Sequence, residues 1–343
     1  MPRRRLLPLA IALAALSGSL AACAASDTAF FVRNKGADMP VWVRGNLQSG
    51  KILIYLHGGP GSNGLTTSTK ESFRAIEQAC GVVYWDQRAS GSSRGDAATD
   101  TLNLAQYVED LDGVVETIKR KYPDRKLILL GHSWGGTLGS AYLLDAKRQA
   151  KVAGWIEVDG AHSVVEGNRL SWQWVKERAA EKVAGGQDAD KWRKVLSWYD
   201  QNPVVTVAND PAHQGHVEEL EESLVPPPSS GGMAYVNLGM VSPYAPLAGA
   251  TNGRYVMGSF VLTQAFLDID LTSELGKIGL PSLVLWGRHD GRLPVAMAAT
   301  AFDRLGTPAA SKSLRIFEHS AHSPHLDEPG AFADAVKGFV AGL

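Results

Sequence analysis

The pentapeptide Gly131-His132-Ser133-Trp134-Gly135 lies between an apolar run, Leu127–Leu130, and a run of small residues, Gly136–Leu144. The first run predicts a buried strand and the second a helix, so the pentapeptide occupies a sharp turn between them. A serine between two glycines at such a turn matches the nucleophile elbow, where small neighbours let the backbone project the serine hydroxyl. A chain with 36 glycines would contain G-x-S-x-G by chance roughly one time in four. The surrounding sequence must therefore support this interpretation.

The overall composition is that of an ordinary globular protein. The chain has 343 residues, of which 45% are hydrophobic and 20% charged, with a formal net charge of -1. This balance offers no basic surface, so we expect no nucleic-acid partner. The sequence lacks a P-loop, zinc-spaced cysteine pairs and an H-E-x-x-H motif, so we expect no cofactor and no metal. Catalysis would then depend on side chains alone, and nothing in the sequence indicates the oligomeric state.

The N-terminus has the three parts of an export signal. Arginines 3–5 precede an apolar run, Leu6–Leu16, which is too short for a transmembrane helix, and small residues follow. Leu20-Ala21-Ala22-Cys23 resembles the bacterial lipobox, which implies removal of residues 1–22 and lipidation of Cys23. A plain secretory signal cut nearby is the alternative. We expect a lipid-anchored protein on the periplasmic side of a bacterial envelope, in the outer membrane because Ala24 is no inner-membrane retention signal.

Strand and helix patterns alternate along the rest of the chain. Runs at 30–33 and 40–44 flank a turn signal at 34–38, which predicts a hairpin of two antiparallel edge strands. Continuous apolar strands are predicted at 52–56, 82–85, 127–130, 152–158, 282–286 and 314–317, and helices at 104–118, 294–305 and 330–340. Such runs are typical of parallel strands covered on both faces. We predict an α/β fold, with a mostly parallel central sheet flanked by helices.

A long helical region interrupts this alternation. From about Ala161 to Phe266 the chain has long helical stretches, a breaker cluster at 226–232 and four of its nine tryptophans. We interpret residues 161–266 as a helical cap inserted between two parts of one core, 23–160 and 267–343. The cap tryptophans either line an apolar substrate pocket or pack the cap core; they are Trp172, Trp174, Trp192 and Trp198. Cys80 lies in an apolar stretch, and we expect a buried thiol that is not a nucleophile.

Loops after the predicted strands carry the partners that a serine nucleophile needs. A serine hydroxyl needs a base, and the base needs an acid that fixes its tautomer. In proteins with a nucleophile elbow, the serine is followed along the chain first by the acid and then by the histidine. Asp290 follows the strand 282–286, and His319, His322 and His325 follow the strand 314–317.

Five motifs, in this order and spacing, resemble the prolyl iminopeptidase family of α/β-hydrolases. They are His57-Gly58-Gly59-Pro60-Gly61, Asp86-Gln87-Arg88, the elbow with Gly136, Gly287-x-x-Asp290 and Ala321-His322-Ser323-Pro324. The resemblance implies an α/β-hydrolase fold with Ser133 as nucleophile, Asp290 as acid and His322 as base. It also implies an oxyanion hole formed by the backbone N–H groups of Gly59 and Trp134, each worth about 3 to 4 kcal/mol in the transition state. The implied activity is a serine aminopeptidase that releases N-terminal proline or small residues from short peptides.

Several positions have competing interpretations. Asp159 also follows a strand, Asp268 and Asp270 lie at the end of the cap, and His319 and His325 neighbour His322. Ser133 itself has an alternative as an ordinary loop serine.

Other polar residues near these motifs have structural interpretations. We expect His57 and His132 to pack loops, and Arg88 with Asp86 to tie down the loop near the glycine cluster. Ala89 stands where the family has glycine, which is tolerated if φ is negative there.

The substrate class depends on the cap. An aminopeptidase must bind a free α-amino group, and the available carboxylates are Glu157, Glu166, Glu177, Glu181 and the cluster 218–222. The same triad supports an esterase, lactonase or amidase acting on a small molecule. A non-catalytic ligand-binding protein on the same fold is the third interpretation.

Overall fold

The structure of this chain is a computed structural model, which describes residues 28–95, 97–225, 252 and 255–343. The predicted leader 1–22, Cys23 and part of the predicted cap lie outside the described residues. No helix in the described ranges is long and apolar enough to cross a membrane.

A nine-stranded sheet forms the centre of the described part of the chain. Its order is β1-β2-β4-β3-β6-β7-β8-β9, and β5 pairs with β2 outside this path. The strands are β1 (Thr28–Asn34), β2 (Ala37–Gly45), β3 (Lys51–Leu56), β4 (Gly81–Trp85), β5 (Arg94–Gly95), β6 (Lys126–His132), β7 (Gly154–Val158), β8 (Ser282–Gly287) and β9 (Lys312–Phe317). From β4 to β9 all neighbours are parallel, which confirms the predicted mostly parallel sheet.

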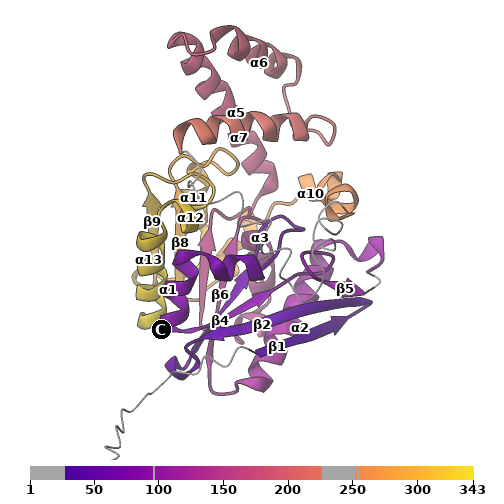
Figure 1. Cartoon of the computed structure of the whole chain (residues 1–343), viewed down its shortest axis with the longest axis vertical. Coiled ribbons are helices and arrows are strands. Elements are labelled where there is room, and N and C mark those ends of the chain that lie inside the picture. Colours follow the sequence, from indigo (N-terminus) through magenta and orange to yellow (C-terminus); the bar gives the residue numbers. More distant parts are fainter. Residues whose placement is uncertain (1–27, 96, 226–251, 253–254) are drawn as a thin grey trace, which may run out of the picture.

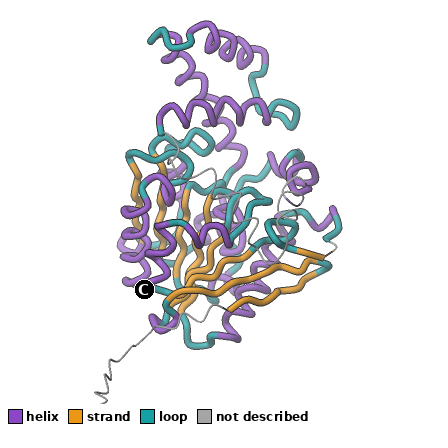
Figure 2. Tube along the Cα trace, viewed as in Figure 1, coloured by secondary structure: helices purple, strands orange, loops and turns teal. Residues whose placement is uncertain are grey.

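Helices cover both faces of the sheet, which is why its central strands, such as β3, β4 and β8, are almost wholly buried and mostly apolar. One face packs against α1 (Glu71–Ala79) and α13 (Pro329–Gly342), through side chains such as Phe73 and Phe332. The other packs against α2 (Leu104–Lys121), α3 (Trp134–Leu143) and α11 (Ala296–Arg304). Figure 1 shows these layers, and Figure 2 shows the strands enclosed between helices.

Short helical segments connect these elements. The short α-helices are α4 (Ala146–Gln149), α10 (Gln264–Leu267) and α12 (Pro324–Asp327). Single 3₁₀ segments lie at Leu47–Ser49, Leu65–Thr69, Thr99–Thr101, Thr272–Lys277 and Ala309–Ser311, and a π-helical segment lies at Met257–Val261.

The predicted hairpin forms, but only one of its strands is an edge. β1 and β2 pair antiparallel from Thr28 opposite Val43 to Asn34 opposite Ala37. β2 also pairs with β4, with Val41 opposite Trp85, so β2 lies inside the sheet. The prediction of two edge strands was therefore wrong for β2. Cys80 is fully buried, as predicted, and burial raises the pKa of its thiol to about 12.

Three long helices stand apart from the sheet between β7 and β8. They are α5 (Val164–Ala184), α6 (Ala189–Gln201) and α7 (Asp210–Leu224), at the top of Figure 1. They share an apolar cluster of their own, which includes the buried Trp172 and Trp192. Where the chain leaves and rejoins the sheet region, the Val164 N–H donates to the Ile269 carbonyl at 2.8 Å. This bond joins the two ends of the helical insertion, whose exact boundaries at 161 and 266 stay a prediction.

Candidate active site

Ser133 occupies a strained turn between β6 and α3. Its backbone has φ 56° and ψ -120°, and its N–H donates to the Val158 carbonyl at 3.0 Å. A Cβ on Gly131 would lie 2.2 Å from the Gly135 carbonyl oxygen, and a Cβ on Gly135 would lie 2.0 Å from that of Leu56. Only glycine fits at either position, so both glycines of the pentapeptide are required by the turn.

Asp290 and His322 follow β8 and β9 and meet at the same edge of the sheet. His322 Nδ1 and Asp290 Oδ2 are 2.9 Å apart. Asp290 Oδ1 accepts the backbone N–H groups of Arg292 and Leu293, each at 2.9 Å, and its carboxylate is fully buried. This arrangement fixes the carboxylate and has it accept the His322 Nδ1–H, which leaves His322 Nε2 free to act as a base.

The competing histidines have other surroundings. The His319 N–H donates to Glu328, and the His319 side chain is exposed. His325 is buried against the rings of Phe73 and Phe332, and burial holds the pKa of His325 well below its ordinary value. Of the three candidates, only His322 is hydrogen-bonded to Asp290.

The competing carboxylates are likewise engaged elsewhere. Asp268 accepts from Gln264, and Asp270 accepts from the Thr272 N–H, both at exposed positions. Asp159 is fully buried, and its Oδ1 accepts the Gly287 N–H at 2.8 Å.

His132 supports His322 through its main chain. His132 Nε2 lies 2.7 Å from the His322 carbonyl oxygen, so this nitrogen carries the proton and donates. Burial, together with the neighbouring His322, lowers the pKa of His132 to about 3. A neutral His132 with its proton on Nε2 therefore holds the His322 loop in place, which agrees with its predicted structural role.

A network links the glycine cluster to the elbow helix. Gln87 Nε2 donates to the His57 carbonyl at 3.0 Å, and Gln87 Oε1 accepts the Trp134 indole N–H at 2.9 Å. His57 Nε2 accepts the Gln87 backbone N–H at 3.1 Å, so its Nδ1 carries the proton and donates to the Gly58 carbonyl at 2.8 Å. Burial lowers the pKa of His57 to about 4, which keeps the ring neutral. Gln87 thus ties the segments that carry Gly59 and Trp134 to each other.

The predicted pairing of Arg88 with Asp86 was wrong. The Arg88 guanidinium makes a fully buried bidentate pair with Asp110 on α2, at 2.7 and 2.8 Å. Asp86 instead accepts the N–H groups of Gly64 and Ser92, at 2.6 and 2.7 Å, and so ties down the loop without Arg88. An ion pair in the interior is stable only with such well-aligned partners.

Ala89 also differs from expectation. Its φ is 50°, in the left-handed region, whereas the sequence argument required a negative φ for alanine to be tolerated there. Alanine in place of glycine therefore imposes strain at this position.

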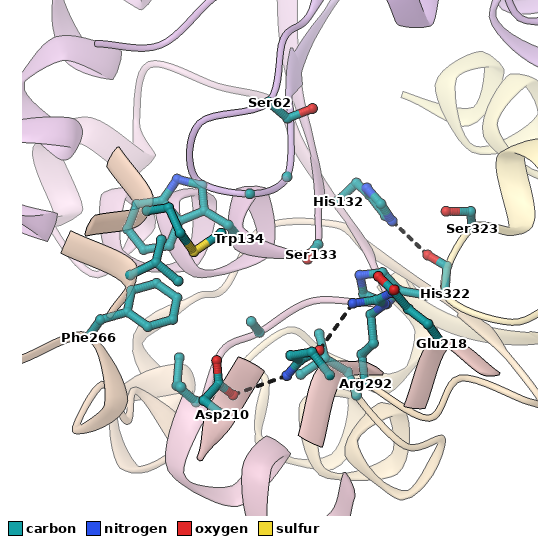
Figure 3. Close-up of a pocket in the computed structure, with 18 of the residues that line it drawn as sticks. Ser62, His132, Ser133, Trp134, Asp210, Glu218, Phe266, Arg292, His322 and Ser323 are labelled. Atoms are coloured by element: carbon teal, nitrogen blue, oxygen red, sulfur yellow. Dashed lines mark hydrogen bonds and ion pairs between the residues drawn. The ribbon is translucent and has the colours of Figure 1, made fainter. Parts of the chain in front are cut away.

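A cavity of about 980 Å³ opens over these residues. Ser133, His322, Gly59 and Trp134 all line it, and Figure 3 shows Ser133 between Trp134 and His322. One part of the lining is apolar, formed by Val164, Met257, Val261, Leu262, Phe266, Leu267 and Leu293. None of the four cap tryptophans lines the cavity. They pack in the apolar cluster of the cap instead. Of the two predicted roles, packing of the cap core is therefore the one that the structure supports.

The charged part of the lining comes from α7, from the loop after Asp290 and from Lys70, directly before α1. Asp210, Gln214 and Glu218 lie four residues apart on α7 and therefore share one helix face. Arg292 donates to Gln214 at 3.1 Å and to Glu218 at 2.8 Å, and Gln214 donates to Asp210 at 3.2 Å (Figure 3). Burial raises the pKa of Asp210 above its ordinary value.

Sequence reasoning missed Asp210 and Arg292, although the four-residue spacing on α7 was readable. Of the cap carboxylates that it named, Glu218 lines the cavity, whereas Glu157, Glu166, Glu177 and Glu181 do not. In the described part of the chain, no group of three or more His, Cys, Asp or Glu side chains is arranged to hold a metal ion.

The fold and this edge of the sheet define a class of protein. A model of the alpha/beta hydrolase fold matches residues 51–329, and the chain belongs to that family and is a hydrolase. Among individual proteins, it is similar to the proline iminopeptidase of Saccharolobus solfataricus, with 27% identity over 85% of each chain. A probable aminopeptidase of Bacillus subtilis, YbaC, is 24% identical over 83% of this chain and 87% of that protein.

Solved structures agree on the fold. A proline iminopeptidase from Mycobacterium smegmatis superposes with a TM-score of 0.65 at 18% identity, covering 92% of this chain and 98% of that one. An esterase from Exiguobacterium antarcticum superposes with a TM-score of 0.59 at 17% identity, covering 91% and 98%. The predicted resemblance to prolyl iminopeptidases and the predicted α/β-hydrolase fold are both confirmed.

Proposed function

We propose that this chain is a serine aminopeptidase that releases N-terminal residues through an acyl-enzyme. The observation that carries the proposal is that the strained Ser133 and His322 line the same cavity, with His322 hydrogen-bonded to the buried Asp290. Ser133 Oγ attacks the scissile carbonyl while His322 Nε2 accepts its proton. The N–H groups of Gly59 and Trp134 stabilise the oxyanion. His322 then protonates the leaving amine, and water repeats the sequence to release the N-terminal residue.

The charged face of α7 supports a substrate with a free amine. Asp210 lines the cavity with Gln214 as its hydrogen-bond donor, so its carboxylate has room to accept further N–H groups. Glu218, on the same helix face, already pairs with Arg292. An ammonium group beside Asp210 would restore the charge that burial disfavours there, because an opposite charge favours the ionised carboxylate. The apolar lining suits a proline or small apolar side chain.

Active-site labelling tests the nucleophile. A fluorophosphonate probe should label the wild-type protein, and Ser133→Ala should abolish both labelling and turnover. Ser62→Ala, which changes another serine of the cavity lining, serves as the control and should still be labelled. A wild-type protein that is not labelled would contradict the hydrolase mechanism.

A substrate panel tests the need for a free amine. We expect cleavage of proline and alanine anilides, with N-acetylproline anilide a poor substrate. Asp210→Asn should raise KM for proline anilide about tenfold or more, because a charge-assisted hydrogen bond is lost. The control is Glu222→Gln, an exposed position on the same helix, which should leave KM unchanged.

An esterase is the second candidate function. The apolar side of the cavity favours it, because an acyl chain would bury its carbons there. In the same panel, an esterase would hydrolyse a short-chain p-nitrophenyl ester best. It would also be insensitive to N-acetylation and to Asp210→Asn, and that result would exclude the aminopeptidase.

We also propose that Cys23 anchors the protein to the periplasmic side of a bacterial membrane. The lipobox-like Leu20-Ala21-Ala22-Cys23 supports this, and only residues 24–27 separate Cys23 from β1. Cys23→Ala should release the protein from the membrane fraction, whereas Cys80→Ala, at the buried thiol, should not. A Cys23→Ala protein that stays with the membranes would contradict lipid anchoring.

A further inference from the structure

Asp159 lies directly behind the proposed acid, at the end of β7. Its side chain is fully buried, and its backbone has a φ of 42°. One carboxylate oxygen, Oδ1, accepts the Gly287 N–H at 2.8 Å at the end of the neighbouring strand β8. No N–H or O–H group among the described residues donates to the other oxygen, Oδ2. The Asp159 carboxyl instead contacts the carboxyl of Asp290.

Two carboxylates in contact in a dry site cannot both be ionised, so one of them holds a proton. Asp290 accepts three hydrogen bonds, from the Arg292 and Leu293 N–H groups and from His322. Asp159 accepts one. The negative charge is therefore favoured on Asp290 and the proton on Asp159, at the oxygen that has no donor. Burial, and then the charge of Asp290, raise the pKa of Asp159 well above its ordinary value.

We propose that Asp159 is a positioning residue that stays protonated and donates its O–H to the Asp290 carboxylate. A carboxylate has about four acceptor sites, and this bond adds a fourth donor to the three already present. With all four occupied, Asp290 cannot rotate away from His322 Nδ1. The inference rests on the proposed function, because it assigns Asp159 to the support of the same Ser133–His322–Asp290 arrangement.

Other charged groups around this pair affect its titration. Glu221 reaches in from α7, where its Oε1 accepts the Gly291 N–H at 2.8 Å, and burial raises the pKa of Glu221 to about 7. Arg292 lies beside Glu221, and His322 faces Asp290 from the other side. On β7 itself, Glu157 pairs with His162 at 2.9 Å. A test of Asp159 must therefore separate its proton from that of Glu221.

Infrared difference spectroscopy makes that separation without measuring activity. At about pH 8, above the pKa of about 7 of Glu221, the wild-type protein minus Asp159→Asn should show the carbonyl stretch of a protonated carboxylic acid. Glu221→Gln should leave this band in place. Absence of the band from the wild-type protein would overturn the proposal. Because this readout needs no substrate, it remains decisive even if Ser133 proves not to be the nucleophile.

Kinetics test the positioning role itself. An asparagine at position 159 can donate to Asp290 and accept from the Gly287 N–H, so Asp159→Asn should keep kcat within about threefold of the wild-type value and leave KM unchanged. Asp159→Ala has neither group, and its kcat should fall roughly 10- to 100-fold with little change in KM. In the wild-type protein kcat should fall at high pH as Asp159 ionises, whereas Asp159→Asn should lack that fall. If Asp159→Asn is as impaired as Asp159→Ala, the donated hydrogen bond is not what matters and the proposal fails.

Discussion

Five non-glycine residues of the described chain have a positive φ, and Ser133 and Asp159 are among them. Left-handed backbone costs an L-residue roughly 1 to 2 kcal/mol, so such positions persist only where the surroundings enforce them. At Ser133 the close approach of Gly131, Gly135 and Leu56 enforces the turn, and the result is a serine that lines the cavity at the start of α3. The backbone of Ala89 is strained in a similar way, with a φ of 50°, but Ala89 does not line the cavity.

Replacing Ala89 by glycine should therefore stabilise the protein. Relief of the left-handed strain outweighs the extra freedom that glycine has in the unfolded chain, so we expect a gain of about 0.5 to 1 kcal/mol. Urea unfolding of the wild-type protein and Ala89→Gly measures this gain. Ala180→Gly, at an exposed position within α5, is the control and should lose about 1 kcal/mol. A destabilised Ala89→Gly protein would show that the buried methyl matters more than the backbone strain.

Single residues differ in how far the sequence can predict them. The edge of the sheet that carries Ser133, Asp290 and His322 could be predicted because each follows a strand, and parallel strands end at the same edge of a sheet. The choice of Asp290 over Asp159, and of His322 over its neighbouring histidines, came from the resemblance to the prolyl iminopeptidase family. The place of Asp210 in the cavity lining and the contacts of Arg292 with Gln214 and Glu218 could not be predicted, because both depend on how α7 docks over the sheet. The φ of Ala89 could not be read either, because its loop is held partly by a residue distant in the sequence, through the Gly64 N–H that donates to Asp86.

At the scale of elements, the site depends on how the loop after β3 is held against α3. Gln87 bonds the His57 carbonyl at one end and the Trp134 indole at the other. The proposed oxyanion donors lie on these two segments, at Gly59 and Trp134. Donors of this kind act only when they are fixed before charge develops. We therefore expect Gln87, which does not line the cavity, to help fix the relative position of the two proposed donors.

Removal of the Gln87 side chain should loosen this connection. We expect Gln87→Ala to lower kcat roughly 10- to 100-fold with a smaller change in KM, because displacement of the donors weakens transition-state binding more than substrate binding. Steady-state kinetics on proline anilide measure both constants. Gln78→Ala, at an exposed position on α1, should behave as wild type. An unchanged kcat in Gln87→Ala would mean that the loop holds its geometry without this bridge.

Element types were more predictable than element partners. Continuous apolar runs identified β3, β4, β6, β7 and β8 because helices bury both sides of these strands. The short run at 314–317 also identified β9, although most residues of that edge strand are exposed or half-buried. The position of β2 inside the sheet could not be read, because strand order depends on long-range pairing. Arg88 was assigned to its near neighbour Asp86, whereas its partner Asp110 comes from α2, a separate element. Local spacing predicts which elements form but not which distant elements meet.

At the scale of the whole molecule, the helical insertion is coupled to the loop that carries Asp290. Glu221 of α7 accepts the N–H groups of Gly291 and Arg292, at 2.8 and 3.3 Å. The Ser171 hydroxyl of α5 donates to the Gly291 carbonyl. These three bonds hold α5 and α7 against the residues directly after Asp290. Movement of these helices would therefore disturb the acid as well as the cavity.

His213 makes this coupling sensitive to acid. Because the Ser171 hydroxyl donates to Gly291, its oxygen accepts the His213 Nε2–H at 2.9 Å, and His213 Nδ1 accepts the Tyr199 hydroxyl at 2.7 Å. Burial, together with the neighbouring His216, lowers the pKa of His213 to about 3. The neutral ring therefore contributes stability that is complete above pH 6.5, the ordinary histidine pKa, and is lost progressively as the pH falls from there towards about 3.

The His213→Gln variant should remove this dependence, since glutamine can donate and accept but does not titrate. Between about pH 7 and pH 5 the wild-type protein should lose about 2 kcal/mol more unfolding free energy than His213→Gln, at 1.36 kcal/mol per pH unit below 6.5. Urea unfolding followed by tryptophan fluorescence measures this, because Trp172 packs on the His213 ring at 4.6 Å. His319→Gln, at an exposed histidine, is the control and should follow the wild-type protein. Equal pH dependence in His213→Gln and wild type would show that protonation of His213 does not limit the stability of the helical insertion.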